Sequence, residues 1–179
     1  MRTINNCGRG TLLIALALGL LLVTTEVSAT ERPNFTGTWL LVKEKSSNLP
    51  DIFGVTDEYL LIINQKDDNS IAVSTEIHGR GQTISSEPDL YPINGTAVEK
   101  LDQRGVKLKR SFRYDEASGR LLVDTEKRFT GQIQLPDTDE SEVWELSDQG
   151  KFLTITITPK TTQSQKQVRV FVKRSQEGE

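Results

Sequence analysis

Histidine, cysteine and nucleophile motifs are scarce in this chain of 179 residues, and their scarcity narrows the functions that the sequence supports. The one histidine, His78, and the one cysteine, Cys7, fall short of the three or four ligands of a typical zinc site. No Gly-x-Ser-x-Gly sequence is present, so nothing supports the nucleophile turn of an α/β-hydrolase. We therefore predict a surface or turn position for His78, no catalytic residue, no metal and no cofactor, and a protein that is not an enzyme.

A surplus of basic residues is also missing. Lysine and arginine number 22 against 25 aspartate and glutamate residues, so the formal net charge is −3, and both signs are interspersed. Without a basic stripe or a polybasic segment, neither nucleic acid nor an anionic membrane surface is an expected partner. The most acidic stretch holds Asp137, Asp139, Glu140 and Glu142, but it lacks the glycine and final glutamate of an EF-hand calcium loop. We interpret this stretch as a solvated loop.

No apolar run is long enough to cross a membrane as a helix. The longest, residues 11–23, is shorter than the about 20 residues that a spanning helix needs. Positive charges at Arg2 and Arg9 precede this run, and the small residues of Val27-Ser28-Ala29 follow it. This order is typical of a secretory signal peptide, for which we predict cleavage after Ala29 and a periplasmic or secreted product. An uncleaved N-terminal anchor is the alternative.

Removal of residues 1–29 would leave one domain over residues 30–179. Cys7 precedes the apolar run, whereas a lipoprotein carries its cysteine at the cut, so we expect no lipid anchor. The mature chain would then contain no cysteine and no disulfide. A domain of about 150 residues buries roughly 68–70% of its unfolded surface, which is enough for a core to hold it. We expect no stable membrane insertion after cleavage.

From Asn34 onward, apolar and polar residues alternate with the period of two that is typical of half-buried strands. Short connections make neighbouring strands antiparallel, and closure into a barrel removes the exposed edges. We predict an all-β, up-and-down antiparallel meander of about 8–10 strands, closed into a lipocalin-like barrel. Two packed sheets are the alternative. The runs that alternate are 35–42, 59–65, 70–78, 82–86, 90–93, 97–103, 106–114, 120–129, 132–135, 142–146, 152–158 and 165–173.

Two connections have distinctive sequences. Asn94-Gly95 predicts a two-residue hairpin turn, because both residues accept positive φ angles. Residues 43–57 form the longest irregular stretch, and we expect it to hold a short helix or to pass over one end of the barrel.

Arg110 lies on the apolar face of its predicted strand, between Leu108 and Phe112. One interpretation makes it an internal counter-ion for an anionic ligand, held by paired hydrogen bonds. The other places it near the barrel mouth, with its guanidinium group extending to water. Lys127 and Thr75 raise the same two alternatives.

The segment Asn34-Phe35-Thr36-Gly37-Thr38-Trp39-Leu40 resembles the first strand of the calycin group, which includes lipocalins and intracellular fatty-acid-binding proteins. The pattern extends over about residues 34–173, although the motif is only Gly37-x-Trp39. Residues 144–154 look like those of bacterial exported lipocalin-like proteins. The resemblance implies a β-barrel that binds a small apolar or amphipathic molecule.

The same resemblance gives Arg169, in the last predicted strand, two roles. In lipocalins an arginine of this strand packs across the motif tryptophan, here Trp39, by a cation–π contact. Fatty-acid-binding proteins carry Arg-x-Tyr there and use it to hold a carboxylate, but here the sequence is Arg169-Val170-Phe171, which lacks the tyrosine hydroxyl. The residues that we expect to contact a ligand are Trp39, Arg110, Phe112, Tyr114, Trp144 and Arg169.

Three functions remain as hypotheses. The first is an exported ligand-binding barrel. The second is a protein-interaction or envelope-structural module, because an eight-stranded barrel can be filled by its own side chains. The third, an enzyme on the same barrel, is least supported by the residues. An internal cavity of about 300 Å³ or more favours the first hypothesis, and a packed interior favours the second.

The predicted cleavage can be checked directly. Protein recovered from the envelope fraction of a bacterial host that expresses the whole chain is expected to begin at Thr30, because signal peptidase reads the small residues Val27-Ser28-Ala29. Intact-mass spectrometry measures this N-terminus. A mass that still includes residues 1–29 would support the uncleaved anchor instead.

Overall fold

The computed structural model describes residues 32–101, 105–130, 136–161 and 164–175. The predicted signal peptide and the predicted strand at 132–135 lie outside these ranges. Within them, no helix has the length and apolar character needed to cross a membrane.

Almost all regular structure in the described residues is β-strand, and every strand pairing is antiparallel. Two short 3₁₀ helices, η1 (Lys43–Lys45) and η2 (Asp51–Gly54), lie in the first connection, as expected for residues 43–57. The strands are β1 (Gly37–Leu41), β2 (Glu58–Asp67), β3 (Ser70–Gly79), β4 (Gln82–Ser85), β5 (Asp89–Pro92), β6 (Asn94–Leu101), β7 (Val106–Asp115), β8 (Arg120–Phe129), β9 (Thr138–Ser147), β10 (Phe152–Pro159) and β11 (Gln167–Lys173).

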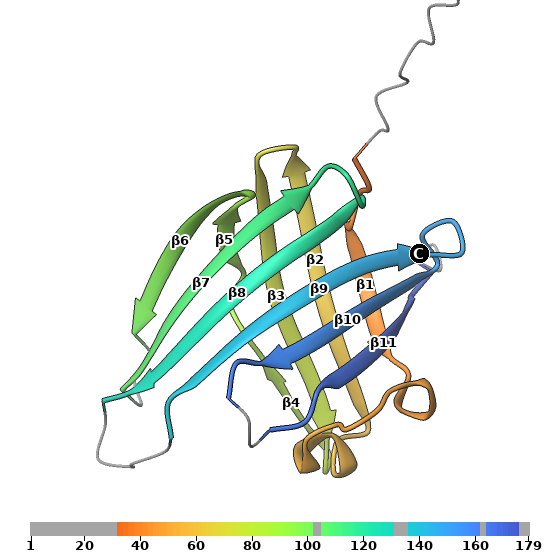
Figure 1. The fold of residues 1–179 in the computed structure, drawn as a ribbon. Helices are drawn as coiled ribbons and strands as arrows, with labels where there is room; N and C mark the ends of the chain where they lie inside the picture. The colour runs from red at the N-terminus through yellow and green to blue at the C-terminus, as the bar shows by residue number, and fades with distance from the viewer. Residues whose placement is uncertain (1–31, 102–104, 131–135, 162–163, 176–179) are drawn as a thin grey trace, which may run out of the picture.

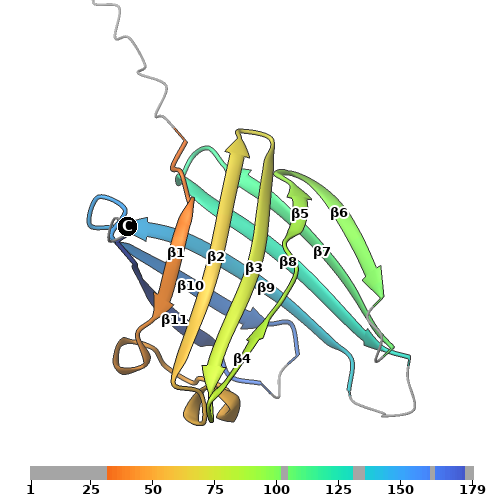
Figure 2. The same cartoon turned by 180° about the vertical axis from the view of Figure 1, so that it is seen from behind.

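The strands form one curled sheet in the order β4-β3-β2-β1-β11-β10-β9-β8-β7-β6. The first strand pairs with both β2 and the last strand, β11, so the two ends of the chain meet inside the sheet (Figures 1 and 2). The curled meander confirms the predicted fold class. At the ends of the sheet, β4 and β5 both pair with β3, and the described residues contain no ladder that joins β5 to β6.

The predicted hairpin turn at Asn94-Gly95 is wrong. β5 pairs with β3 and β6 pairs with β7, so the two strands that flank these residues are not partners. Gly95 has a φ of 86°, and the register of β6 against β7 shifts between Asn94 and Ala97. The glycine therefore builds a bulge at the start of β6, which is the other structure that a positive φ permits in a strand.

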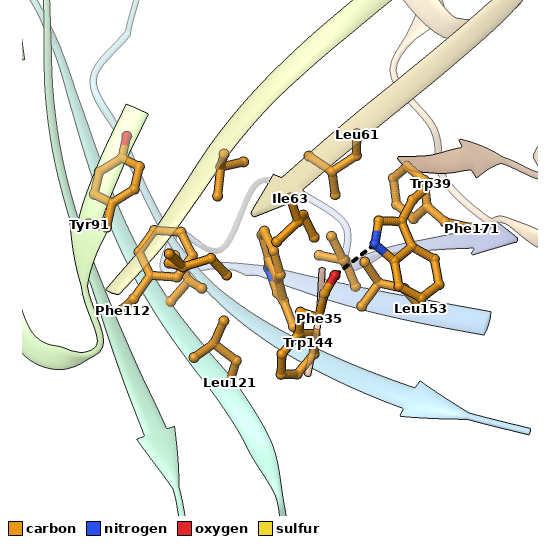
Figure 3. Close-up of a cluster of buried hydrophobic side chains, with 14 of the residues drawn as sticks. Phe35, Trp39, Leu61, Ile63, Tyr91, Phe112, Leu121, Trp144, Leu153 and Phe171 are labelled. Atoms are coloured by element: carbon orange, nitrogen blue, oxygen red, sulfur yellow. Dashed lines mark hydrogen bonds between the residues drawn. The ribbon is translucent and has the colours of Figure 1, made fainter. Parts of the chain in front are cut away.

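The core fills one half of the barrel. Trp39, Phe112, Leu121 and Leu153 have no measurable exposure, and Trp144 is 1% exposed (Figure 3). Ring centroids lie 4.7 Å apart for Tyr91 and Phe112 and 5.6 Å apart for Phe112 and Trp144. These rings come from β5, β7 and β9, and their contacts leave this half of the interior filled by side chains.

The motif residues Gly37 and Trp39 organise the entry into β1. The indole N–H of Trp39 donates a 2.9 Å hydrogen bond to the backbone carbonyl of Phe35, which satisfies its polar atom inside the core (Figure 3). Lys173 crosses the ring, with Nζ 5.4 Å from its centroid. The prediction that Arg169 packs on Trp39 is therefore wrong. The register pairs Trp39 with Lys173, which leaves Arg169 four residues away along β11.

Replacement of Gly37 by alanine is expected to lower the free energy of unfolding by about 1–3 kcal/mol, because it overpacks this contact. The added Cβ would lie 2.7 Å from Cε of Lys173 and 3.3 Å from Nε1 of Trp39. Urea denaturation measures the change. The control is Gly54→Ala, where no atom lies within 4 Å and a change within about 0.5 kcal/mol is expected. Equal losses in both variants would contradict the explanation by close approach.

Candidate functional site

A cavity of about 180 Å³ occupies the half of the barrel opposite the Trp39 core. Its wall is apolar on several strands and charged on four, β7, β8, β9 and β11. The apolar lining consists of Leu61, Val73, Leu108, Trp144, Ile155, Ile157 and Phe171. The polar lining consists of Tyr59, Thr75, Arg110, Thr125, Lys127, Glu140, Glu142 and Arg169.

Arg110 and Glu142 form an ion pair at the bottom of this cavity. Nη2 of Arg110 lies 2.7 Å from Oε1 of Glu142, and the two side chains are 19% and 8% exposed. The other carboxylate oxygen accepts a 2.8 Å hydrogen bond from the indole N–H of Trp144. The hydroxyl of Thr125 lies 3.5 Å from Oε1. Arg110 thus points inward, as its strand parity predicts, and its partner belongs to the protein itself.

Three aromatic rings surround the guanidinium group of Arg110. The guanidinium carbon lies 5.1 Å from the ring centroid of Phe112, 5.9 Å from that of Trp144 and 6.0 Å from that of Tyr91. Burial raises the pKa of Tyr91 to about 12, so this ring stays neutral at ordinary pH. The stacked cation separates the cavity from the packed half of the barrel.

The acidic stretch is not the solvated loop that we predicted. β9 begins at Thr138, and alternate residues of a strand face opposite sides, so Glu140 and Glu142 point into the barrel. Asp137 and Asp139 lie outside and pair with Arg128. The stretch therefore places two carboxylates in the cavity wall.

Arg169 contrasts with Arg110, because no carboxylate of the described residues pairs with it. Its Nη2 donates a 3.0 Å hydrogen bond to the side-chain carbonyl of Gln167, and its buried Nε has no hydrogen-bond partner. Its guanidinium carbon lies 5.0 Å from the ring centroid of Phe53. Burial raises the pKa of the neighbouring Tyr59, and the positive charge of Arg169 opposes that rise.

The cavity lining contains three basic and two acidic side chains, so one basic side chain has no acidic partner in it. Glu142 pairs with Arg110 at 2.7 Å, and Glu140 pairs with Lys127 at 3.5 Å. Arg169 is the remaining charged residue of the lining. The wall therefore carries one uncompensated positive charge, and this charge stands beside apolar side chains.

The η1–η2 connection lies at the end of the barrel where β2 begins (Figure 1), and the cavity-lining Tyr59 stands at that end of β2. Phe53 of η2 is 5% exposed and packs edge-on against Tyr59, with 5.0 Å between ring centroids. Ile52 and Val55, on either side, are about half exposed. Phe53 thus packs behind two residues of the cavity wall, Tyr59 and Arg169.

The six residues expected to contact a ligand lie in three places. Arg110, Trp144 and Arg169 line the cavity, whereas Trp39 and Phe112 belong to the packed core. Tyr114 lies under the guanidinium group of Arg32, with 5.2 Å from its centroid to that group.

Sequence reasoning missed the lining residues Tyr59, Thr125 and Glu142. A period-two pattern was available for Glu142, because it stands two residues before Trp144 on the same strand and so shares its face.

His78 lies on the surface, as predicted. Its Nε2 is 2.6 Å from a carboxylate oxygen of Glu76, and its Nδ1 is 3.0 Å from the hydroxyl of Thr83. In the part of the chain that the structure describes, no three His, Cys, Asp or Glu side chains form a group that could hold a metal.

Comparison with known proteins does not assign this chain to a family. No family model and no curated protein matches the chain. Among solved structures, a fatty-acid-binding protein from Manduca sexta is 15% identical with a TM-score of 0.46, over 78% of this chain and 99% of its own. Zebrafish ileal bile acid-binding protein, solved with cholic acid, is 15% identical with a TM-score of 0.48, over 78% and 98%. Likeness at this level says nothing about what this chain binds.

The internal ion pair makes a sharp stability prediction. Arg110→Met is expected to lower the free energy of unfolding by about 3 kcal/mol, because it leaves the carboxylate of Glu142 buried without its cation. The double variant Arg110→Met/Glu142→Leu is expected to recover most of that loss, since apolar residues can replace a buried pair. Denaturant titration of both variants measures this, and a double variant no more stable than the single one would show that the pair is not coupled.

Proposed function

We propose that this protein binds a small, acidic, amphipathic molecule in the barrel cavity and that it does so after export from the cytoplasm. The observation that carries the binding proposal is Arg169, whose charge lacks a carboxylate partner among the described residues and faces a cavity lined by both apolar and polar side chains. Export rests on the charge, apolar run and small residues within positions 1–29.

The chemistry of Arg169 favours an anionic group. A buried guanidinium is stabilised when a carboxylate accepts hydrogen bonds from it, and its Nε is free to donate one. Leu61, Ile157 and Ile155, the register partner of Arg169 on β10, also line the cavity and favour an apolar body. An acidic head and an apolar body are together the features of an amphipathic acid.

The volume of the cavity sets the size of that body. Sites for drug-sized ligands usually measure about 300–1,000 Å³, whereas this cavity measures about 180 Å³. An apolar cavity of about 150 Å³ accepts benzene. The resting cavity therefore suits a molecule with a single ring or a short chain, which guides the choice of probes.

The solid half of the barrel favours a second candidate, an interaction or envelope-structural module. Trp39, Phe112 and Leu121 fill that half completely, and the cavity lies below the usual range for ligand sites. In that function Arg169 would hold η2 through Phe53, and the cavity would hold only water.

Calorimetric titration of residues 30–179 with benzoate and with benzyl alcohol separates the two candidates. Benzoate is expected to bind more tightly than the alcohol, and Arg169→Gln is expected to weaken benzoate by about tenfold or more, because one charged hydrogen-bonded contact is lost. The alcohol should bind both proteins equally.

Arg120→Gln is the matched control. Arg120 also has a buried Nε without a partner, but it pairs with Glu145 on the outside of the barrel. It should leave benzoate affinity unchanged. No binding of benzoate, together with no co-purifying small mass in native mass spectrometry, would favour the interaction module.

A further inference from the structure

We propose that Glu142 restricts the ligand to a single negative charge, because it neutralises Arg110 inside the cavity. This inference rests on the proposed function and names the charge class of its ligand. It makes Glu142 a positioning residue: it fixes the charge that the wall presents, and it acts through Arg110 and not by touching the ligand's acidic group.

The lining contains two guanidinium groups, and they differ in one respect. Arg169 has the amide of Gln167 as its side-chain partner, whereas Arg110 has the carboxylate of Glu142 at 2.7 Å. Without Glu142 both guanidinium groups would be available to anions, so the cavity would present two positive charges to a ligand with two carboxylates. With Glu142 present, a second acidic group that approaches Arg110 meets a fixed negative charge.

The carboxylate of Glu142 is held firmly in this position. Arg110 and Trp144 donate to different oxygens of it, at 2.7 and 2.8 Å. The side chain is 8% exposed, so water screens its charge weakly. Repulsion between Glu142 and a second ligand carboxylate is correspondingly strong, because like charges in a desolvated site interact at low effective dielectric.

The second internal pair provides a comparison. Lys127 and Glu140 lie 3.5 Å apart, and their side chains are 38% and 20% exposed. Water screens this pair more strongly than the Arg110–Glu142 pair, so its loss should affect selectivity less. Glu140→Gln therefore changes the net charge of the cavity by the same amount as Glu142→Gln, at a wetter place.

Calorimetry with benzoate and isophthalate, which carry one and two carboxylates on one ring, tests the proposal. The wild-type domain is expected to bind benzoate and to reject isophthalate. Glu142→Gln is expected to raise the affinity for isophthalate relative to benzoate by about tenfold or more, and Glu140→Gln by about threefold or less. An unchanged ratio in a folded Glu142→Gln protein would overturn the proposal.

If Glu142→Gln fails to fold, a second pair of variants tests the proposal. Arg110→Gln leaves Glu142 uncompensated, so benzoate affinity should fall by about tenfold. Arg110→Gln/Glu142→Gln removes both charges and should restore benzoate binding to within about threefold while isophthalate stays excluded. Failure of the second substitution to restore binding would show that Arg110 itself holds the ligand, and would overturn the proposal.

The two proposals fail in different ways. If the wild-type domain binds no benzoate, the proposed function is wrong. If benzoate binds and depends on Arg169, but Glu142→Gln leaves the ratio for isophthalate unchanged or the double variant fails to restore benzoate binding, the proposed function holds and the role of Glu142 is wrong.

Discussion

The pairing of β1 with both β2 and β11 is the constraint on which the barrel depends. Five residues, Gly37–Leu41, join the strands β2–β5 to the strands β6–β11, and the described residues contain no ladder at the opposite side of the sheet. Trp39 anchors this strand in the core, with its indole N–H satisfied by Phe35. Without β1 no backbone ladder of the described residues would join the two groups of strands, and side-chain bonds such as that of Lys100 to Asp89 would be what remains.

The division of the interior into a dry half and a charged half follows the strands residue by residue. On β7 the inward positions pass from Phe112 to Arg110, and on β9 they pass from Trp144 to Glu142. Each step moves two residues along a strand and exchanges an aromatic ring for a charge. The rings then shield the pair on one side, and the cavity lies on the other.

The sequence predicted what depends on neighbours along the chain and missed what depends on register. Alternation located most strands and the inward direction of Arg110, because both follow from the period of two. It did not pair Arg110 with Glu142, which is 32 residues away and meets it only through the registers of β7, β8 and β9. For the same reason Lys173, and not Arg169, reached Trp39. Gly95 showed where φ is positive, but only the partners of β5 and β6 decide between a turn and a bulge.

Because no ladder in the described part of the chain joins β5 to β6, the barrel is held less firmly at this seam than elsewhere around its wall. Wherever strands are paired, widening the barrel means breaking rows of backbone hydrogen bonds. At this seam no ladder of the described strands crosses, but the chain itself joins the two sides through Ile93, the residue between β5 and β6. The barrel is therefore held together unequally around its circumference: backbone ladders join the other strands, whereas side-chain contacts such as the Asp89–Lys100 ion pair hold this seam.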